Sequence, residues 1–142
     1  MSNQERKAII RKWVDAAWNN GDFSMGADLY PADYVLHYNN MPDTRGTGGL
    51  AGFINMYRHA MPDLRMEIED MAAEGDKVIW RIRTSGTHTG DFVGIPPTGN
   101  RVDTPGIVIS RFEGDRWVED WVVNDDMSVF QQLGVIPALT PA

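Results

Sequence analysis

The amino-acid sequence predicts a single α+β domain in which helices come first and antiparallel strands follow. Two observations support this prediction. Apolar residues recur at helical spacing as far as Met61, and from Leu64 onward they alternate with polar residues, as in strands with one buried face. Helices and strands in separate halves of a chain are typical of α+β proteins rather than of doubly wound parallel sheets. The length of 142 residues predicts one domain, 1–142.

Three helices and one strand are expected in the first half. Apolar side chains at spacings of three and four predict a helix over 4–20, and a short second helix is expected over 23–30. The aromatic and β-branched run 34–38 predicts a strand. Helical spacing returns over 50–61, and Pro62 ends this third helix because proline lacks the backbone N–H that the next turn would need.

The second half predicts a curved sheet and a last helix. Strands are expected over 64–68, 78–82, 102–112 and 117–124. The segment 94–100 contains two prolines, so it is expected to be a shaped turn between strands. The last helix is expected over 127–133 and is ended by Gly134. A curved sheet that closes on its helices forms a cone, whose interior is either packed or a pocket.

The composition excludes several classes of function. The net charge of −7 and the isoelectric point near 4.8 disfavour a nucleic-acid partner. The absence of cysteine excludes disulfides, zinc–thiolate sites and a cysteine nucleophile. The three histidines lack metal-ligand spacing and no phosphate-binding loop with its lysine is present, so neither a metal nor a cofactor is expected. No secretory leader or membrane segment is recognised, which predicts a cytoplasmic protein without a membrane partner.

Asp125 is the first candidate for acid–base chemistry. It follows Glu119, Trp121 and Val123 at period two, so on a regular strand it shares their face. Burial among apolar neighbours would raise the pKa of its carboxyl towards neutrality, where a carboxylate works as a general base. The alternative is that Asp125 or Asp126 is the N-cap of the last helix. Because the two side chains point in opposite directions, one can cap the helix while the other faces inward.

Two histidines and an arginine are further candidates. His88 lies between small residues in a strand, so its imidazole can approach a ligand; alternatively, neighbouring strands or water satisfy both of its nitrogens. The same two interpretations apply to His37. Arg81 and Arg83 share the sheet face opposite the apolar residues of their strand. Either could orient a substrate carbonyl, or both could pair with acidic residues of the preceding strand at the surface.

Aromatic side chains are candidates for ligand contacts. Trp13, Phe53, Tyr57 and Trp121 belong to a set of aromatic and methionine residues that is first expected in the core. Five tryptophans and eight methionines are nevertheless a large number for a chain of this length. A pocket for a flat apolar molecule would be lined by such side chains, so both interpretations stay open.

Four stretches form a recognisable pattern: 33–37, 86–99 with its Gly-Ile-Pro-Pro-Thr-Gly turn, 119–125 and 132–134. In these stretches, and in order over nearly the whole chain, the sequence resembles the SnoaL-like polyketide cyclase family. The resemblance implies a nuclear-transport-factor-2-like cone, in which a curved antiparallel sheet wraps on N-terminal helices around an apolar cavity. It also implies a homodimer.

The resemblance further implies a reaction. Described members of the family close a ring of an aromatic polyketide methyl ester by intramolecular aldol condensation, without metal or cofactor. The match implies that Asp125 is the general acid/base, that His88 and Arg81 occupy positions typical of the cavity, and that His88 stabilises the enolate. His37, also a candidate substrate contact, matches a histidine common among relatives. The strand segment 107–112 departs from the characterised cyclases, which carry a histidine there.

We therefore expect a cofactor-independent cyclase that acts on a small apolar carbonyl compound. The alternatives are a non-catalytic dimeric binder of a hydrophobic ligand and a related hydroxylase or hydrolase on the same fold. Epoxide hydrolysis is disfavoured, because Arg83 stands where the second carboxylate of the related epoxide hydrolases would be. A binder would tolerate Asp125→Asn with little loss of ligand affinity, whereas an enzyme needs a carboxylate that titrates abnormally inside the cavity.

Overall fold

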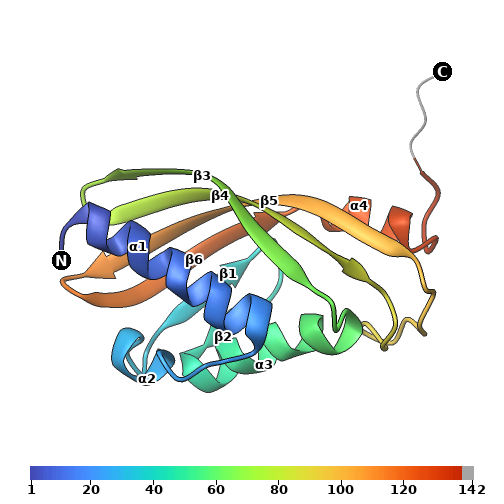
Figure 1. Cartoon of the computed structure of the whole chain (residues 1–142), viewed down its shortest axis with the longest axis horizontal. Coiled ribbons are helices and arrows are strands. Elements are labelled where there is room, and N and C mark those ends of the chain that lie inside the picture. The colour runs from blue at the N-terminus through green and yellow to red at the C-terminus, as the bar shows by residue number, and fades with distance from the viewer. Residues whose placement is uncertain (139–142) are drawn as a thin grey trace.

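The computed structural model describes residues 1–138, which form helices on one side and six strands in one curved sheet (Figure 1). The helical elements are α1 (Asn3–Trp13), the π-helical turn η1 (Val14–Trp18), α2 (Gly26–Leu29), α3 (Gly46–Ala60) and α4 (Asp126–Gln132). The strands are β1 (Val35–Tyr38), β2 (Thr44–Arg45), β3 (Arg65–Glu74), β4 (Lys77–Thr87), β5 (Arg101–Glu113) and β6 (Arg116–Asn124). This is the α+β class that the sequence predicts.

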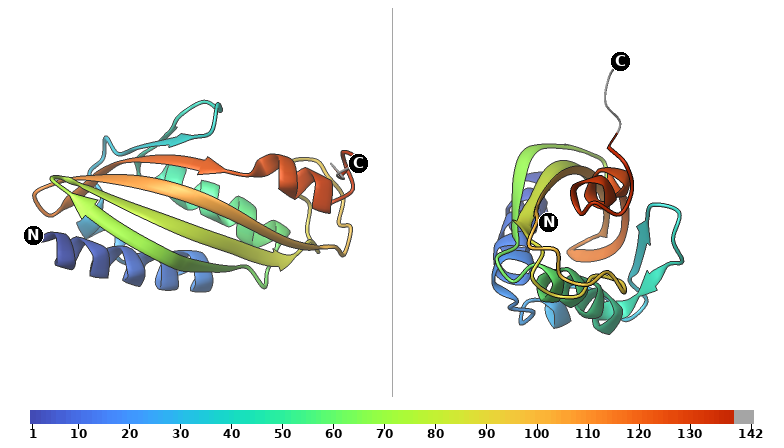
Figure 2. Two further views of the ribbon diagram at one scale, coloured as in Figure 1. Left: turned by 90° about the horizontal axis from the view of Figure 1, so that it is seen from above. Right: turned by 90° about the vertical axis from the view of Figure 1, so that its right-hand side faces the viewer.

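The sheet has the order β2-β1-β6-β5-β4-β3 and is not closed. Neighbouring strands are antiparallel except β1 and β6, which run parallel. The expectation of a wholly antiparallel sheet is wrong at this junction. Seen end-on, the sheet curves around an interior that α1 and α3 close on the open side (Figure 2). The expected cone is therefore present, and its interior is the place to look for a site.

The helices differ from the expected ranges only near their ends. Helix α1 begins after Ser2, which forms a capping box with Glu5. The expected range 4–20 is an α-helix that continues as a π-helical turn. Helix α3 begins at Gly46, four residues before the first apolar residue that predicted it. Gly46 has a φ of +71°, a left-handed conformation that glycine adopts without strain.

Alternation along β4 and β5 sends apolar side chains inward and charged ones outward. Strand β6 breaks this alternation, because Trp117 and Asp120 are both buried with two residues between them. From Asp120 onward the even-numbered residues face inward, which includes Asn124. This shift decides which acidic residues reach the interior. Within residues 1–138, no helix is long and apolar enough to cross a membrane.

Candidate functional site

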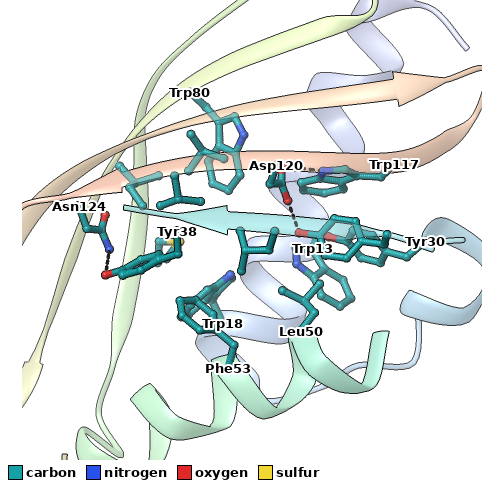
Figure 3. A pocket seen from close by; sticks show the side chains of 16 residues that line it. Trp13, Trp18, Tyr30, Tyr38, Leu50, Phe53, Trp80, Trp117, Asp120 and Asn124 are labelled. Carbon is teal, nitrogen blue, oxygen red and sulfur yellow. Dashed lines mark hydrogen bonds between the residues drawn. The ribbon is translucent and has the colours of Figure 1, made fainter. Parts of the chain in front are cut away.

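Two small cavities lie inside the cone and meet at Asn124, which lines both. The first has a volume of about 40 Å³ and is walled by side chains from the N-terminal helices, α3 and the inner sheet face (Figure 3). Its lining includes Trp13, Trp18, Tyr38, Leu50, Phe53, Trp80 and Asp120. The second, of about 20 Å³, lies beside α4 and is lined by Tyr57, His88, Thr104, Asp126 and Val129, among others.

Asp126 is the acidic residue of the second cavity. Its Oδ1 accepts a hydrogen bond from the Tyr38 hydroxyl at 2.7 Å, and its Oδ2 accepts one from Asn39 Nδ2 at 2.8 Å. The side chain is half-buried, and desolvation raises the pKa of its carboxyl above the ordinary aspartate value, although the two hydrogen bonds oppose this shift. A carboxylate with a raised pKa inside a cavity is suited to general acid–base chemistry.

Two tyrosines extend this site by a chain of hydroxyl groups. The Tyr38 and Tyr57 hydroxyl oxygens are 2.7 Å apart. Because Tyr38 gives its one proton to Asp126, Tyr57 must donate to Tyr38. The chain therefore runs from Tyr57 through Tyr38 to Asp126. Burial raises the pKa of both phenols, so both stay protonated and act as donors.

His88 is buried and lines the second cavity. The Gly-Ile-Pro-Pro-Thr-Gly turn brings Thr98 back against it, so that Thr98 N–H donates to Nδ1 at 3.2 Å and the Thr98 hydroxyl lies 2.9 Å from the same nitrogen. Since Nδ1 accepts, the neutral imidazole carries its proton on Nε2. Nε2 is buried and has no hydrogen-bond partner within residues 1–138. The turn thus leaves one N–H donor in the cavity free to bind a ligand oxygen.

Asp120 is the acidic residue of the first cavity, and the sequence analysis missed it. Its carboxylate accepts from the hydroxyls of Ser110 and Tyr34 and from Trp117 Nε1. Burial raises the pKa of Asp120 to about 6 although all three donors oppose the shift. The signal that could have found it is the pair Trp117 and Asp120, which the break in alternation brings to one face. Because Asp120 is buried and its carboxylate accepts three hydrogen bonds from protein donors, it is better suited to fix the strands than to react.

The structure places Asp125 outside both cavities. It is exposed and is the N-cap of α4, where its Oδ1 accepts from Ser128 N–H at 3.0 Å. The expected desolvation of Asp125 is therefore wrong, and the N-cap alternative describes its geometry. It does share a face with Trp121 and Val123, but that face is the outer one, on which Val123 is 69% exposed. As the opposite directions of the two aspartates allow, Asp126 faces the interior instead.

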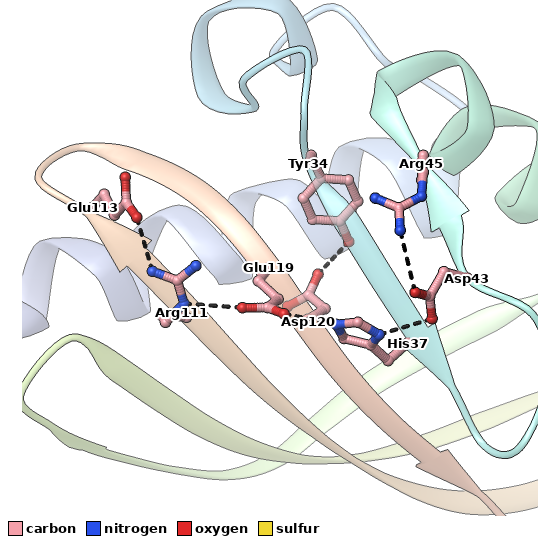
Figure 4. A network of polar contacts seen from close by, with 8 residues as sticks. All are labelled: Tyr34, His37, Asp43, Arg45, Arg111, Glu113, Glu119 and Asp120. Carbon is pink, nitrogen blue, oxygen red and sulfur yellow. Dashed lines mark hydrogen bonds and ion pairs between the residues drawn. The ribbon is translucent and has the colours of Figure 1, made fainter.

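Three of the expected substrate contacts also lie on the outer face. His37 is held between Asp43 and Glu119, at 2.8 and 2.7 Å (Figure 4). Its ring also stacks on Trp121. The hydrogen bond to Glu119 is the main cause that raises the pKa of His37. Arg81 pairs with Glu69 at 3.1 Å, which is the surface pairing considered as its alternative. The expected placement of His37, Trp121 and Arg81 in the cavity is therefore wrong.

The other expected contacts do reach the interior. Trp13 and Phe53 line the first cavity, and Tyr57 and His88 line the second. Their contact with a substrate stays a prediction. No group of three or more histidine or acidic residues is placed to hold a metal ion among residues 1–138.

The comparisons with known proteins give a consistent result. The family model described as SnoaL-like polyketide cyclase matches residues 8–133. AclR from Streptomyces galilaeus, named as a proposed hydroxylase, is 32% identical with a TM-score of 0.84, over 98% of this chain and 87% of that one. IdmH from Streptomyces antibioticus, named as a proposed polyketide cyclase, is 29% identical with a TM-score of 0.77, over 90% and 97%.

A protein from Catenulispora acidiphila, described as having a ketosteroid isomerase-like fold, has a TM-score of 0.75 at 19% identity, over 94% of this chain and 97% of that one. At this identity, the likeness concerns the fold alone. No curated protein matches the chain.

Proposed function

Because the chain belongs to the SnoaL-like polyketide cyclase family, we propose that it closes a ring in an apolar polyketide methyl ester, or a related carbonyl compound, by aldol-type condensation. The observation that supports this most is the Asp126 carboxylate, which faces a cavity together with the free N–H of His88. Asp126 replaces Asp125 as the proposed general acid/base, and His88 keeps its expected role. No metal or cofactor takes part in this proposal.

The proposed reaction needs one base that later acts as an acid. Asp126 removes a proton from the carbon next to a substrate carbonyl, and the electron pair moves onto that carbonyl oxygen as an enolate. The His88 Nε2–H stabilises the enolate oxygen by a hydrogen bond. The enolate carbon then bonds to a second carbonyl carbon of the same molecule, and the protonated Asp126 returns its proton to the new alkoxide. No atom is gained or lost in the ring closure.

The tyrosine chain supports both protonation states of Asp126. When Asp126 is ionised, Tyr38 and Asn39 donate to it and limit how far burial raises its pKa. When Asp126 is protonated, the Tyr38 O–H can rotate to donate to Tyr57 instead. The Tyr38 oxygen then accepts a hydrogen bond from the protonated carboxyl group of Asp126. The base therefore has a partner before and after proton transfer, which reduces the reorganisation that the reaction requires.

Substrate binding requires the interior to open. Cavities of about 40 and 20 Å³ hold only water-sized molecules. The side chains that must move are those that pack edge-to-face across the first cavity, Trp18, Phe53 and Tyr38. Aromatic side chains give a flat apolar substrate large contact areas once they separate. The proposed substrate-binding residues are accordingly Trp13, Phe53 and Tyr57.

The test compares two neighbouring aspartates. Asp126→Asn is expected to lower the rate of ring closure by roughly 100-fold to 10,000-fold, the usual range for loss of a general acid/base. Asp125→Asn is the matched control, because asparagine caps a helix as well as aspartate does. Cyclisation of a panel of polyketide methyl esters is followed by chromatography and mass spectrometry. Equal rates in Asp126→Asn and in the unchanged protein would refute the role of Asp126.

A non-catalytic binder of a hydrophobic ligand is the second candidate, and the aromatic wall of the first cavity favours it. A binder would give no turnover, and its ligand affinity would be nearly the same in both variants. The likeness to AclR adds a hydroxylase as a related possibility within the family.

We also propose a homodimer formed through the outer face of the sheet. Exposed apolar side chains cross β4, β5 and β6 there: the register pairs Ile107 with Val123, while Ile109 lies between Ile79 and Trp121. Val123 and Ile107 are 69% and 49% exposed. A contiguous apolar patch on an otherwise charged sheet face is typical of an interface. A two-fold dimer would bury this patch against itself.

A further inference from the structure

The Asn124 side chain stands where the two cavities meet, and one half of its amide has no partner. Its Nδ2 donates to the Tyr38 hydroxyl oxygen at 3.1 Å, and its backbone N–H donates to Asn39 Oδ1 at 2.9 Å. Its Oδ1 is buried and accepts no hydrogen bond from any residue that the structure describes. A buried acceptor that lacks a donor is unfavourable, so this oxygen is expected to bind something with an O–H or N–H group.

The direction of the amide is fixed by its neighbours. The Tyr38 proton goes to Asp126, so the Tyr38 oxygen faces Asn124 as an acceptor and only the NH₂ group can point at it. Figure 3 shows the amide nitrogen directed at Tyr38 and the amide oxygen directed away from it. A flipped amide would place two acceptors against each other. The free oxygen is therefore a consequence of the proton chain that ends at Asp126.

The backbone opposite leaves room for this oxygen. Asn124 pairs with Gly106 across β5 and β6, and a Cβ at Gly106 would lie only 1.9 Å from Asn124 Oδ1. Any residue other than glycine at this position would displace the amide. The sheet thus accommodates the oxygen in a position that no protein donor reaches.

We propose that Asn124 is a specificity-determining residue, whose Oδ1 accepts a hydrogen bond from a hydroxyl group of the substrate. This rests on the proposed function and narrows its substrate class. Two residues that line the second cavity carry a buried polar atom without a partner among the described residues: the acceptor Asn124 Oδ1 and the donor His88 Nε2–H. A hydroxylated aromatic carbonyl compound satisfies both, because its phenolic or alcoholic O–H donates to Asn124 while a carbonyl oxygen accepts from His88.

The oxygen is closed off from water in the free protein, so it becomes accessible only when the interior opens to admit a substrate. A substrate hydroxyl then supplies the missing hydrogen bond, whereas an analogue without the hydroxyl leaves the oxygen unpaired. Sites built to bind a hydroxyl group discriminate strongly against analogues that lack it. We expect at least a tenfold preference for the hydroxylated ligand.

The test measures binding and needs no turnover. Calorimetric titration compares 1-naphthol with 1-fluoronaphthalene, which has similar size and shape but no O–H. The unchanged protein is expected to bind 1-naphthol at least tenfold more tightly. In Asn124→Leu, which keeps the volume and removes the acceptor, the two affinities are expected to lie within threefold of each other. In Tyr38→Phe, which removes the hydroxyl that fixes the direction of the amide, the preference is expected to fall, because the amide can then turn its NH₂ group towards the ligand.

Binding of 1-fluoronaphthalene by Asn124→Leu shows that this variant still folds around the cavity. As a second readout, the side-chain carbonyl ¹³C resonance of Asn124 in the unchanged protein is expected to shift with 1-naphthol and not with 1-fluoronaphthalene. Equal affinities in the unchanged protein, a preference that survives in Asn124→Leu, or no binding of either probe would overturn the proposal. These readouts measure binding and do not depend on catalysis by Asp126. A failure of the Asn124 proposal can therefore be distinguished from a failure of the proposed reaction.

Discussion

At the scale of single residues, three aspartates close together in sequence have three different environments. Asp120 is buried and accepts hydrogen bonds from protein donors, Asp125 is exposed and caps helix α4, and Asp126 faces a cavity. The difference comes from the direction of each side chain, because all three have the same chemistry. Asp120 also lines a cavity and has a raised carboxyl pKa, but it is buried, and only Asp126 combines a raised carboxyl pKa with a partly exposed side chain at a cavity. That combination is why we assign the acid–base role to Asp126.

Asp120 predicts a pH dependence of stability. Its pKa of about 6 in the folded protein exceeds the ordinary aspartate value, so the folded state holds the proton more tightly than the unfolded state does. The contribution of Asp120 to stability is therefore complete below about pH 4 and is lost as the pH rises through 6, by up to about 3 kcal/mol. Asp120→Asn removes this titration.

Urea denaturation of both proteins between pH 4 and pH 7 measures this effect. The difference in unfolding free energy, unchanged protein minus Asp120→Asn, is expected to decrease as the pH rises. A difference that stays constant over this range would show that Asp120 titrates normally in the folded protein.

At the scale of secondary-structure elements, the order and type of the elements could be predicted from sequence, except for the two-residue strand β2 and the π-helical turn η1. The helical spacing over 50–61 is α3, and the alternation over 78–82 is part of β4. What could not be predicted is which residues of β6 face the interior. Alternation assumes a regular strand, whereas Trp117 and Asp120 face inward with two residues between them, and the register shifts between Arg111 and Phe112.

The errors in the predicted site come from the choice of the inner face of the sheet. Counting by twos along β6 correctly groups Trp121 with Asp125, but it cannot tell which face is inside. The two apolar residues Trp121 and Val123 favoured the wrong choice, because an apolar patch on the outer face looks in sequence like a buried face. His88 lines the second cavity, but it follows β4 instead of lying in a strand as expected, and its contact with a ligand stays a prediction.

Two glycine substitutions, one where β5 pairs with β6 and one in helix α3, are expected to have opposite effects on stability. Gly106→Ala places a Cβ 1.9 Å from Asn124 Oδ1, so it is expected to destabilise the protein by about 1–3 kcal/mol, the usual cost of overpacking. Gly52→Ala, in the exposed middle of α3, meets no atom within 4 Å and is expected to stabilise by about 1 kcal/mol, because alanine favours helix. Thermal unfolding compares the two variants, and equal effects would contradict the described packing against Gly106.

At the scale of the whole molecule, the two faces of the sheet have different proposed functions. The inner face carries the residues proposed for chemistry, Asp126, His88 and Asn124, and the outer face carries the apolar patch proposed for dimerisation. The family and the α+β cone were predicted from sequence, and the family model and the structural relatives confirm them. The single domain and the cytoplasmic location stay predictions.

The proposed dimer gives a test at this scale. Val123→Lys places a charge at the most exposed apolar side chain of the patch, so it is expected to convert the dimer into a monomer without affecting the interior. Light scattering after gel filtration measures the mass, for which one chain is 15.9 kDa. Lys77→Glu, at the far end of β4, is a charge-changing control that should leave the dimer intact. A monomeric unchanged protein would rule out the dimer.

The most direct test of the central claim is the ionisation of Asp126, measured by carboxyl ¹³C titration in the folded protein, with Asp126→Asn to assign the resonance. We predict a pKa above the ordinary aspartate value of about 3.9, because burial withdraws part of the side chain from water. A pKa at or below that value would contradict the account, since the carboxyl would then be a hydrogen-bonded surface group and no base would face the cavity.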